Sequence, residues 1–294
     1  MNVAMIVFST SGNTLRVANM LGDEFVSNGV NVQVLELSKR DVFSDGLPLK
    51  SYLREHVEAH DVLCIGSPVY NGHLQYHVKN ILRSLPEPDG VWGRLAMPFV
   101  TWGGVDSGVA LYEAAGFIKN SGRIPIAGMA INAEHQLTRS FSKVLNQGLP
   151  ADEALPFVKA VAEKVMTAVQ KEPYALTDIM KEIKPRKIPE QLKAAFTKNE
   201  KLIQRLFFPD PELDRDLCTG CGTCIANCPV QRLSMSDTGP VARAGAAPCI
   251  HCGECFRWCP SGAMSCSKLK WFEPVLKRMA QKHPRNVVYP GGSA

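Results

Sequence analysis

The sequence lacks any long apolar run, which limits how the protein can meet a membrane. No stretch of about eighteen apolar residues occurs, so we expect no transmembrane segment. The first nine residues lack the basic region and small-residue cleavage site of a secretory signal, and they indicate a strand instead. With 294 residues, 45% of them hydrophobic and 21% charged, the chain is typical of a soluble globular protein of two domains.

A nucleic-acid-binding motif is also missing. The net charge is +5, and the excess of lysine and arginine falls in residues 171–208 and 267–294. Neither segment contains a base-reading or base-stacking motif, so we expect no nucleic-acid partner. The two segments flank a more acidic region, and two interpretations stay open. The basic segments either offset its charge or dock an acidic redox partner.

Two phosphate-binding signatures are absent as well. No G-x-G-x-x-G follows a strand, so direct oxidation of a nicotinamide dinucleotide is not indicated. Residues 9–14 lack the lysine of a Walker A loop. They nevertheless form a hydroxyl-rich turn between an apolar strand and a helical pattern, where backbone N–H groups at the helix start can bind an anion. The alternative is an ordinary capped helix with a polar turn.

Cysteine, by contrast, is plentiful and ordered. Eight of the 10 cysteines fall in 218–229 and 249–260, which both follow C-x2-C-x2-C-x3-C-P. Three closely spaced cysteines can bind three corners of one cubane cluster, whereas the proline turns the fourth away toward the other cluster. We therefore expect two crossed ligand sets: Cys218, Cys221, Cys224 and Cys259 for one [4Fe-4S] cluster, and Cys249, Cys252, Cys255 and Cys228 for the second.

Two zinc sites are the alternative for these cysteines. Zinc knuckles favour two separated cysteine pairs, usually with histidine, over three evenly spaced cysteines and a Cys-Pro. Residues 209–266 resemble the bacterial-type two-[4Fe-4S] ferredoxins, which implies a small α+β domain. Because thiolate ligands and oxygen-sensitive clusters need reducing conditions, we expect a cytoplasmic location. Cys64, outside both motifs, is expected to be a small core residue.

Before the cysteines, apolar strands alternate with helical patterns. Strands are expected at 3–9, 31–37, 61–66, 95–101 and 124–131, and helices after residue 14 and at 73–85, 107–121 and 152–170. Such alternation predicts an α/β domain with a doubly wound, five-stranded parallel sheet. Ligands bind such sheets beyond the carboxyl ends of the strands.

Three loops leave those carboxyl ends, at 9–14, 67–73 and 101–108. Residues 1–170 resemble a flavodoxin-like domain, and more closely the family that fuses such a domain to a bacterial ferredoxin. The resemblance implies FMN, with its phosphate in the first loop and its isoalloxazine between the other two. The residues so implied are Ser9, Thr10, Ser11, Gly12, Asn13, Thr14, Ser67, Pro68, Val69, Tyr70, Asn71, Gly72, Thr101, Trp102, Gly103 and Gly104.

The chemistry of these loops fits a flavin. Asn71 and Gly72 allow a positive φ and a peptide that can flip toward the ring, and the later glycine pair permits close backbone approach. Trp102 and Tyr70 could stack on the ring or pack at the loop base. Gln75 stands where the family often has proline, and residues 134–150 either overhang the flavin edge or form a surface excursion.

The remaining segments complete the domain assignment. Residues 171–208 are expected to be a helical connector, because Gly and Ser are scarce and apolar residues recur at helical spacing. Residues 267–294 are expected to be a basic helix, which packs on the protein or lies on a membrane surface, and a disordered ending from Tyr289. His251, between two ligands, is expected on the solvent side, with an N–H to a cluster sulfur as a further role.

Flavin and clusters in one chain predict a converter between one-electron and two-electron chemistry. The first hypothesis is an electron-transfer module whose partner is a ferredoxin, a reductase or a terminal redox enzyme. The second is a reductase of a small molecule or quinone, for which His73, Asp106 or His135 would be the acid. A redox sensor is the third. No catalytic residue is assigned, and the sequence leaves both a monomer and a homodimer open.

Overall fold

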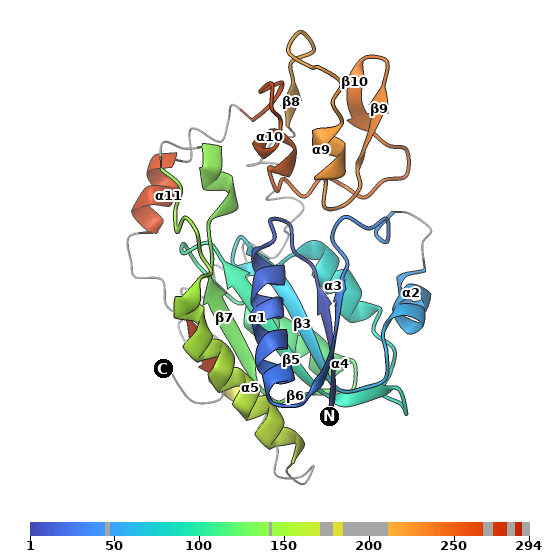
Figure 1. Ribbon diagram of the computed structural model, residues 1–294, viewed down its shortest axis with the longest axis vertical. Coiled ribbons are helices and arrows are strands. Elements are labelled where there is room, and N and C mark those ends of the chain that lie inside the picture. The colour runs from blue at the N-terminus through green and yellow to red at the C-terminus, as the bar shows by residue number, and fades with distance from the viewer. Residues whose placement is uncertain are drawn as a thin grey trace.

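The computed structural model describes residues 1–44, 48–140, 143–170, 179–184, 211–266, 273–280 and 286–289. Figure 1 shows a large domain with a central sheet between two layers of helices, and a small cysteine-rich domain above one end of that sheet. The small domain lies over the end at which β1 turns into α1. The predicted connector helix within 185–208 lies outside the described residues.

Five parallel strands make up the sheet of the large domain, as the alternation predicted. They are β1 (Asn2–Val7), β2 (Asn31–Glu36), β3 (His60–Tyr70), β5 (Trp92–Trp102) and β7 (Gly128–Asn132). Their spatial order is β2-β1-β3-β5-β7, so the chain reverses direction across the sheet beside β1 and β3. This is the flavodoxin-like order, and ligands bind at such a reversal point.

Helices cover both faces of the sheet, because alternate strand residues point to opposite faces. One core joins Val3, Met5 and Val7 to α1 (Asn13–Ser27) and α5 (Leu155–Val169). The other core joins Ala4, Ile6 and Phe8 to the opposite helix layer. That layer contains α2 (Leu49–His56), α3 (Tyr76–Arg83) and α4 (Ala110–Asn120). The sequence analysis did not anticipate α2.

Short elements extend the sheet at its edges. The strand expected at 124–131 divides into β6 (Ile124–Pro125) and β7. β4 (His73–Leu74) pairs with the end of β3, and β12 (Val287–Tyr289) pairs antiparallel with β7. Tyr289, expected in a disordered ending, is therefore a strand residue. The C-terminal segment returns to the large domain after α11 (Glu273–Met279).

The small domain consists of two short strand pairs and two short helices. β8 (Glu212–Leu213) pairs with β11 (Met264–Ser265), and β9 (Leu233–Ser236) pairs with β10 (Gly239–Ala242). Each cysteine motif contains one short helix, α9 (Thr223–Ala226) or α10 (Glu254–Arg257). A glycine at φ 73° or 80° begins each helix. Among the described residues, no helix has the length and apolar character needed to span a membrane.

Candidate cofactor sites

The first loop is held open by its own side chains. Gly12, with φ 88°, caps α1, and the Ser9 hydroxyl accepts a hydrogen bond from the Leu15 N–H at 3.1 Å. The buried hydroxyls of Thr14 and Thr101 lie 2.8 Å apart, joining the first loop to the end of β5. Ser9 therefore stabilises the turn, which leaves the backbone N–H groups at the start of α1 directed to the end of the sheet.

The second and third loops contact each other through their backbones. Asn71 and Gly72 have φ values of 53° and 80°. The Val109 N–H donates to the Gly72 carbonyl at 2.7 Å, and a Cβ on Gly108 would lie 2.2 Å from that same oxygen. A Cβ on Gly103 would lie 2.5 Å from the His135 ring. Glycine is therefore required where these loops approach each other and the segment after β7.

A cavity of about 360 Å³ lies between the three loops, within the size range of small-molecule sites. Of the residues predicted to bind the flavin, it is lined by Thr10, Ser11, Asn13, Thr14, Pro68, Val69, Tyr70, Asn71, Gly72, Thr101, Trp102 and Gly103. Ser9, Gly12, Ser67 and Gly104 are not among the lining residues. Ser67 instead bonds the neighbouring Pro68 carbonyl at 2.8 Å.

Segments distant in sequence complete the cavity. The segment after β7 supplies Glu134, His135, Gln136 and Leu137, so the start of the predicted excursion at 134–150 lines this site. Nine further lining residues were not among those predicted to bind the flavin, although Asp106 was a candidate acid: Val105, Asp106, Ala133, Ile250, His251, Cys252, Val275, Leu276 and Met279. No local pattern could have placed residues of the second cysteine motif here, because only the docking of the two domains brings them together.

Unpaired polar atoms in the cavity wall fit a heteroaromatic ligand. Trp102 Nε1 and His135 Nδ1 are buried and have no hydrogen-bond partner within the described residues. Such atoms are costly unless a ligand or water satisfies them. Most of the remaining surface is apolar, as in sites that bind a planar ring. The residues present therefore fit a flavin: N–H groups and hydroxyls at the first loop, and apolar and aromatic walls at the other two.

The candidate acids differ in their access to this cavity. His73 is buried, bonds Glu113 through Nδ1 at 2.8 Å, and is not a lining residue. Asp106 and His135 do line the cavity. Burial lowers the pKa of His135 to about 4, so its imidazole is neutral at neutral pH. Gln75, where the family often has proline, caps α3 by accepting from the His77 N–H, so the helix begins without the proline.

The cysteines lie in two groups within the small domain. The thiol of Cys224 interacts electrostatically with those of Cys259 and Cys221. The thiol of Cys255 interacts with those of Cys249 and Cys228. Crossed sets, in which the fourth cysteine of each motif serves the other cluster, require these proximities, and Cys255 also interacts with Cys224 of the other group.

A cubane cluster and a single metal ion place different demands on their cysteine ligands. Within the described part of the chain, no three His, Cys, Asp or Glu side chains converge on a point that could hold a single metal ion. A cubane does not require such convergence, because each thiolate binds a different iron. Backbone N–H groups already point at the sulfurs, from Arg232 to Cys228 at 3.3 Å and from His251 to Cys249 at 3.4 Å. Such bonds tune a cluster's potential.

The two domains meet along an interface, called the seam below, and contacts on both of its sides hold them together. On one side, Lys39 donates its backbone N–H to Pro229 at 2.8 Å, and Arg243 pairs with Asp41 at 2.8 Å. On the other side, Thr10 bonds Gln136 at 3.1 Å, and Gln136 bonds Glu254. Gln136 therefore links the first loop to α10. Val230, Ala247, Ile250 and Cys252 join the core of the large domain.

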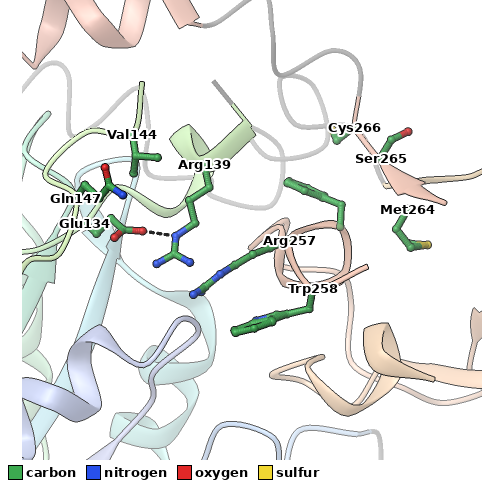
Figure 2. Close-up of a pocket in the computed structure, with 10 residues that line it drawn as sticks. Glu134, Arg139, Val144, Gln147, Arg257, Trp258, Met264, Ser265 and Cys266 are labelled. Carbon is green, nitrogen blue, oxygen red and sulfur yellow. Dashed lines mark ion pairs between the residues drawn. The ribbon is translucent and has the colours of Figure 1, made fainter. Parts of the chain in front are cut away.

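A second hollow, of about 810 Å³, opens beside this seam (Figure 2). The segment after β7 faces α10 and β11 across it, and Glu134 pairs with Arg139 on its wall. Arg257 lies with its guanidinium 4.6 Å from the ring centre of Trp258, which is 46% exposed. Cys266, outside both motifs, lines the same hollow. Of its charged groups, Arg139 pairs with Glu134, and Arg257 pairs with Glu254 of α10.

Comparison with family models divides the chain as the structure does. Residues 1–136 match the family described as NADPH-dependent FMN reductase. Residues 217–264 match the family described as 4Fe-4S dicluster domain. Comparison with curated proteins gives no match.

Several solved structures are similar to part of this chain. One is an apo NADH:FMN oxidoreductase, at 17% identity and TM-score 0.45 over 63% of this chain and 96% of that one. Another is flavodoxin 1 from Bacillus cereus, at 16% identity and TM-score 0.40 over 57% and 98%. A third is rubredoxin oxygen:oxidoreductase from Desulfovibrio gigas, at 16% identity and TM-score 0.43, of which the match spans only 36%.

Because every one of these TM-scores lies below 0.5, the assignment rests on the two family models and on the strand order. The models fall on different domains and do not overlap. The strand order of the large domain is the flavodoxin-like one. The chain therefore joins a flavodoxin-like, FMN-reductase-related domain to a C-terminal 4Fe-4S dicluster domain.

Proposed function

We propose that this protein transfers electrons between two [4Fe-4S] clusters and one FMN within a single chain. One observation carries the proposal. The cavity that fits the flavin is lined on one side by the three loops of the flavodoxin-like domain and on the other by Ile250, His251 and Cys252 of the second cysteine motif. A cluster bound there would lie against the flavin with no intervening domain.

The chain's residues would have separate tasks in this function. Thr10, Ser11, Asn13 and Thr14, with the start of α1, would hold the phosphate. Asn71 and Gly72, already at positive φ, would let their shared peptide turn toward the ring. The eight cysteines would hold the clusters. Bound FMN supplies two-electron chemistry that can also proceed in single-electron steps, whereas clusters carry one electron at a time.

The partner in this proposal is a one-electron carrier protein, such as a ferredoxin, or a redox enzyme that receives the electrons. A small-molecule reductase is the second candidate, and two features of the cavity lining support it. Asp106 reaches the cavity, and the side chains of Val275, Leu276 and Met279 make its outer wall apolar. An apolar, planar acceptor such as a quinone would suit this wall.

Anaerobic purification with iron, sulfide and flavin analysis tests the composition, and about eight irons and one FMN per chain are expected. Stopped-flow mixing with a reduced ferredoxin then tests the transfer. Cys218→Ser and Cys249→Ser should each slow flavin reduction. Cys266→Ser, which changes a cysteine outside both motifs, is the matched control and should leave the rate unchanged.

Equal rates of flavin reduction with and without clusters would refute the proposal. A rate that rises with protein concentration would place the transfer between chains and indicate a dimer. Multiple-turnover reduction of a quinone, without a protein acceptor, would favour the reductase.

A further inference from the structure

The two cysteine motifs differ at one equivalent position. The second residue after the first cysteine is Gly220 in one motif and His251 in the other. Both have left-handed backbone, with φ 69° at Gly220 and 51° at His251. Glycine adopts this conformation freely, whereas a residue with a Cβ is strained in it. The first motif avoids this cost, and the second retains an imidazole in spite of it.

The surroundings of the two positions differ just as clearly. A Cβ on Gly220 would meet nothing within 4 Å, and the neighbouring Cys221 is exposed. His251 and Cys252 line the flavin-fitting cavity, and Cys252 is buried. The loop of the first cysteine motif therefore faces solvent, and the loop of the second cysteine motif faces the flavodoxin-like domain.

The two cysteine groups also lie next to each other. The thiol of Cys255, in the second group, interacts electrostatically with that of Cys224, in the first. A path from solvent can thus run from the group at Cys221, through Cys224 and Cys255, to the cavity at Cys252. The rate of electron tunnelling falls steeply with the gap between carriers. Neighbouring cysteine groups that lead from solvent to the cavity therefore favour transfer through one cluster and then the other, rather than from each cluster separately to the flavin.

We propose that the clusters act in series, with the cluster of Cys218, Cys221, Cys224 and Cys259 exchanging electrons with the external carrier. The cluster of Cys249, Cys252, Cys255 and Cys228 exchanges them with the flavin, and His251 is the positioning residue that fills the gap between the two. This order rests on the proposed function.

Electrons and protons balance when a reduced ferredoxin-type protein is the donor. Two donor molecules each lose one electron, which pass singly through both clusters. The flavin gains the two electrons and takes two protons from water.

Spectroscopy of the full-length protein tests the order without relying on activity. The electron paramagnetic resonance spectrum of the reduced clusters is recorded with FMN bound and after FMN is removed. Removing FMN should change the signal of one cluster alone. The signal that changes should be the one missing from Cys252→Ser and still present in Cys221→Ser.

His251→Gly keeps every ligand and copies the first motif, so it tests the positioning role in a protein with both clusters. We expect it to abolish the FMN-dependent change. We also expect flavin reduction by prereduced clusters to slow at least about tenfold, which corresponds to about 1.4 kcal/mol. Gly220→Asn is the matched control, because asparagine tolerates a left-handed backbone. It should leave both readouts unchanged.

Three results would overturn the order: an FMN-dependent change in the signal missing from Cys221→Ser, a change in both signals, or wild-type behaviour of His251→Gly. These failures differ from failure of the proposed function. If the protein binds both clusters and FMN but the clusters never reduce the flavin, the proposed function itself is wrong. If they do reduce it through the other cluster, only the order is wrong.

Discussion

The two cysteine motifs have the same spacing but differ in their environment. In the first, Cys221 is exposed and Gly222 has open space around it. In the second, Cys252 is buried, and a Cβ on Gly253 would lie 2.6 Å from the Phe256 ring. Burial raises the pKa of the Cys255 thiol to about 12. An internal repeat has thus produced two equivalent loops, and docking on the flavodoxin-like domain has made them unequal.

This inequality matters because a cluster's properties depend on its exposure and on the hydrogen bonds to its sulfurs. Burial of Cys252 limits the access of solvent and chelators to the second group, whereas Cys221 leaves the first group open. We therefore expect the second group to release its iron more slowly.

The largest expected effect is on iron retention. A chelator under oxidising conditions should release iron in two phases of about four irons each, fast from the group that contains the exposed Cys221 and slow from the group that contains the buried Cys252. Iron release followed by absorbance tests this difference. Cys221→Ser should lose the fast phase, and Cys252→Ser the slow one. A single phase in the wild-type protein would show that the two environments do not matter.

The next effect compares how contacts on the two sides of the seam contribute to the free energy of unfolding. Glu254 is buried, pairs with Arg257 at 3.1 Å and accepts from Trp258 Nε1 at 2.8 Å. Glu254→Ala leaves these donors without an acceptor and should lower the free energy of unfolding by about 3 kcal/mol. Arg243→Ala, which removes an exposed pair with Asp41 and bonds to Ser44 and the Gln231 carbonyl, should cause a smaller loss, because these contacts are open to solvent. Anaerobic urea unfolding of the full-length protein compares the two variants.

The glycines that follow Cys221 and Cys252 allow a direct comparison of the two motifs. Gly222→Ala and Gly253→Ala both place a Cβ at positive φ, which costs about 1 kcal/mol in each case. Gly253→Ala also meets the Phe256 ring, so it should cost about 1–3 kcal/mol more. Melting temperatures of the two variants, with both clusters verified, measure the difference. Equal losses would mean that Phe256 moves aside freely.

The smallest effect depends on pH and on the wall of the flavin-fitting cavity. Folding holds the pKa of His135 near 4, below the unfolded value of 6.5, because the ring is buried. Below pH 6.5 the unfolded chain binds a proton that the folded chain does not, so stability falls as the pH drops. At pH 5.5 this group should cost about 1 kcal/mol relative to pH 8. His135→Gln should remove that part of the pH dependence, and an unchanged profile would contradict the assignment.

Much of the fold follows from local sequence pattern. Apolar runs such as 62–66 indicated parallel strands, and helical spacing of Val17, Leu21 and Phe25 indicated the covering helix. The division of the strand at 124–131 was missed, since Pro125 and Gly128 interrupt it without changing its apolar character. The α2 helix was missed for another reason: of its eight residues only Leu53 is buried, so the chain carries little periodic signal there.

For the candidate sites, the sequence determined which residues carry the chemistry. Cysteine spacing is local, since three ligands of one cluster come from one loop. The flavin-binding loops follow strand ends, which sequence can locate. Tertiary structure alone decided that Ile250, His251 and Cys252 line the flavin-fitting cavity and that Cys221 faces solvent. The docking of two domains depends on surfaces assembled from distant segments, so a repeated motif cannot reveal which copy lies buried.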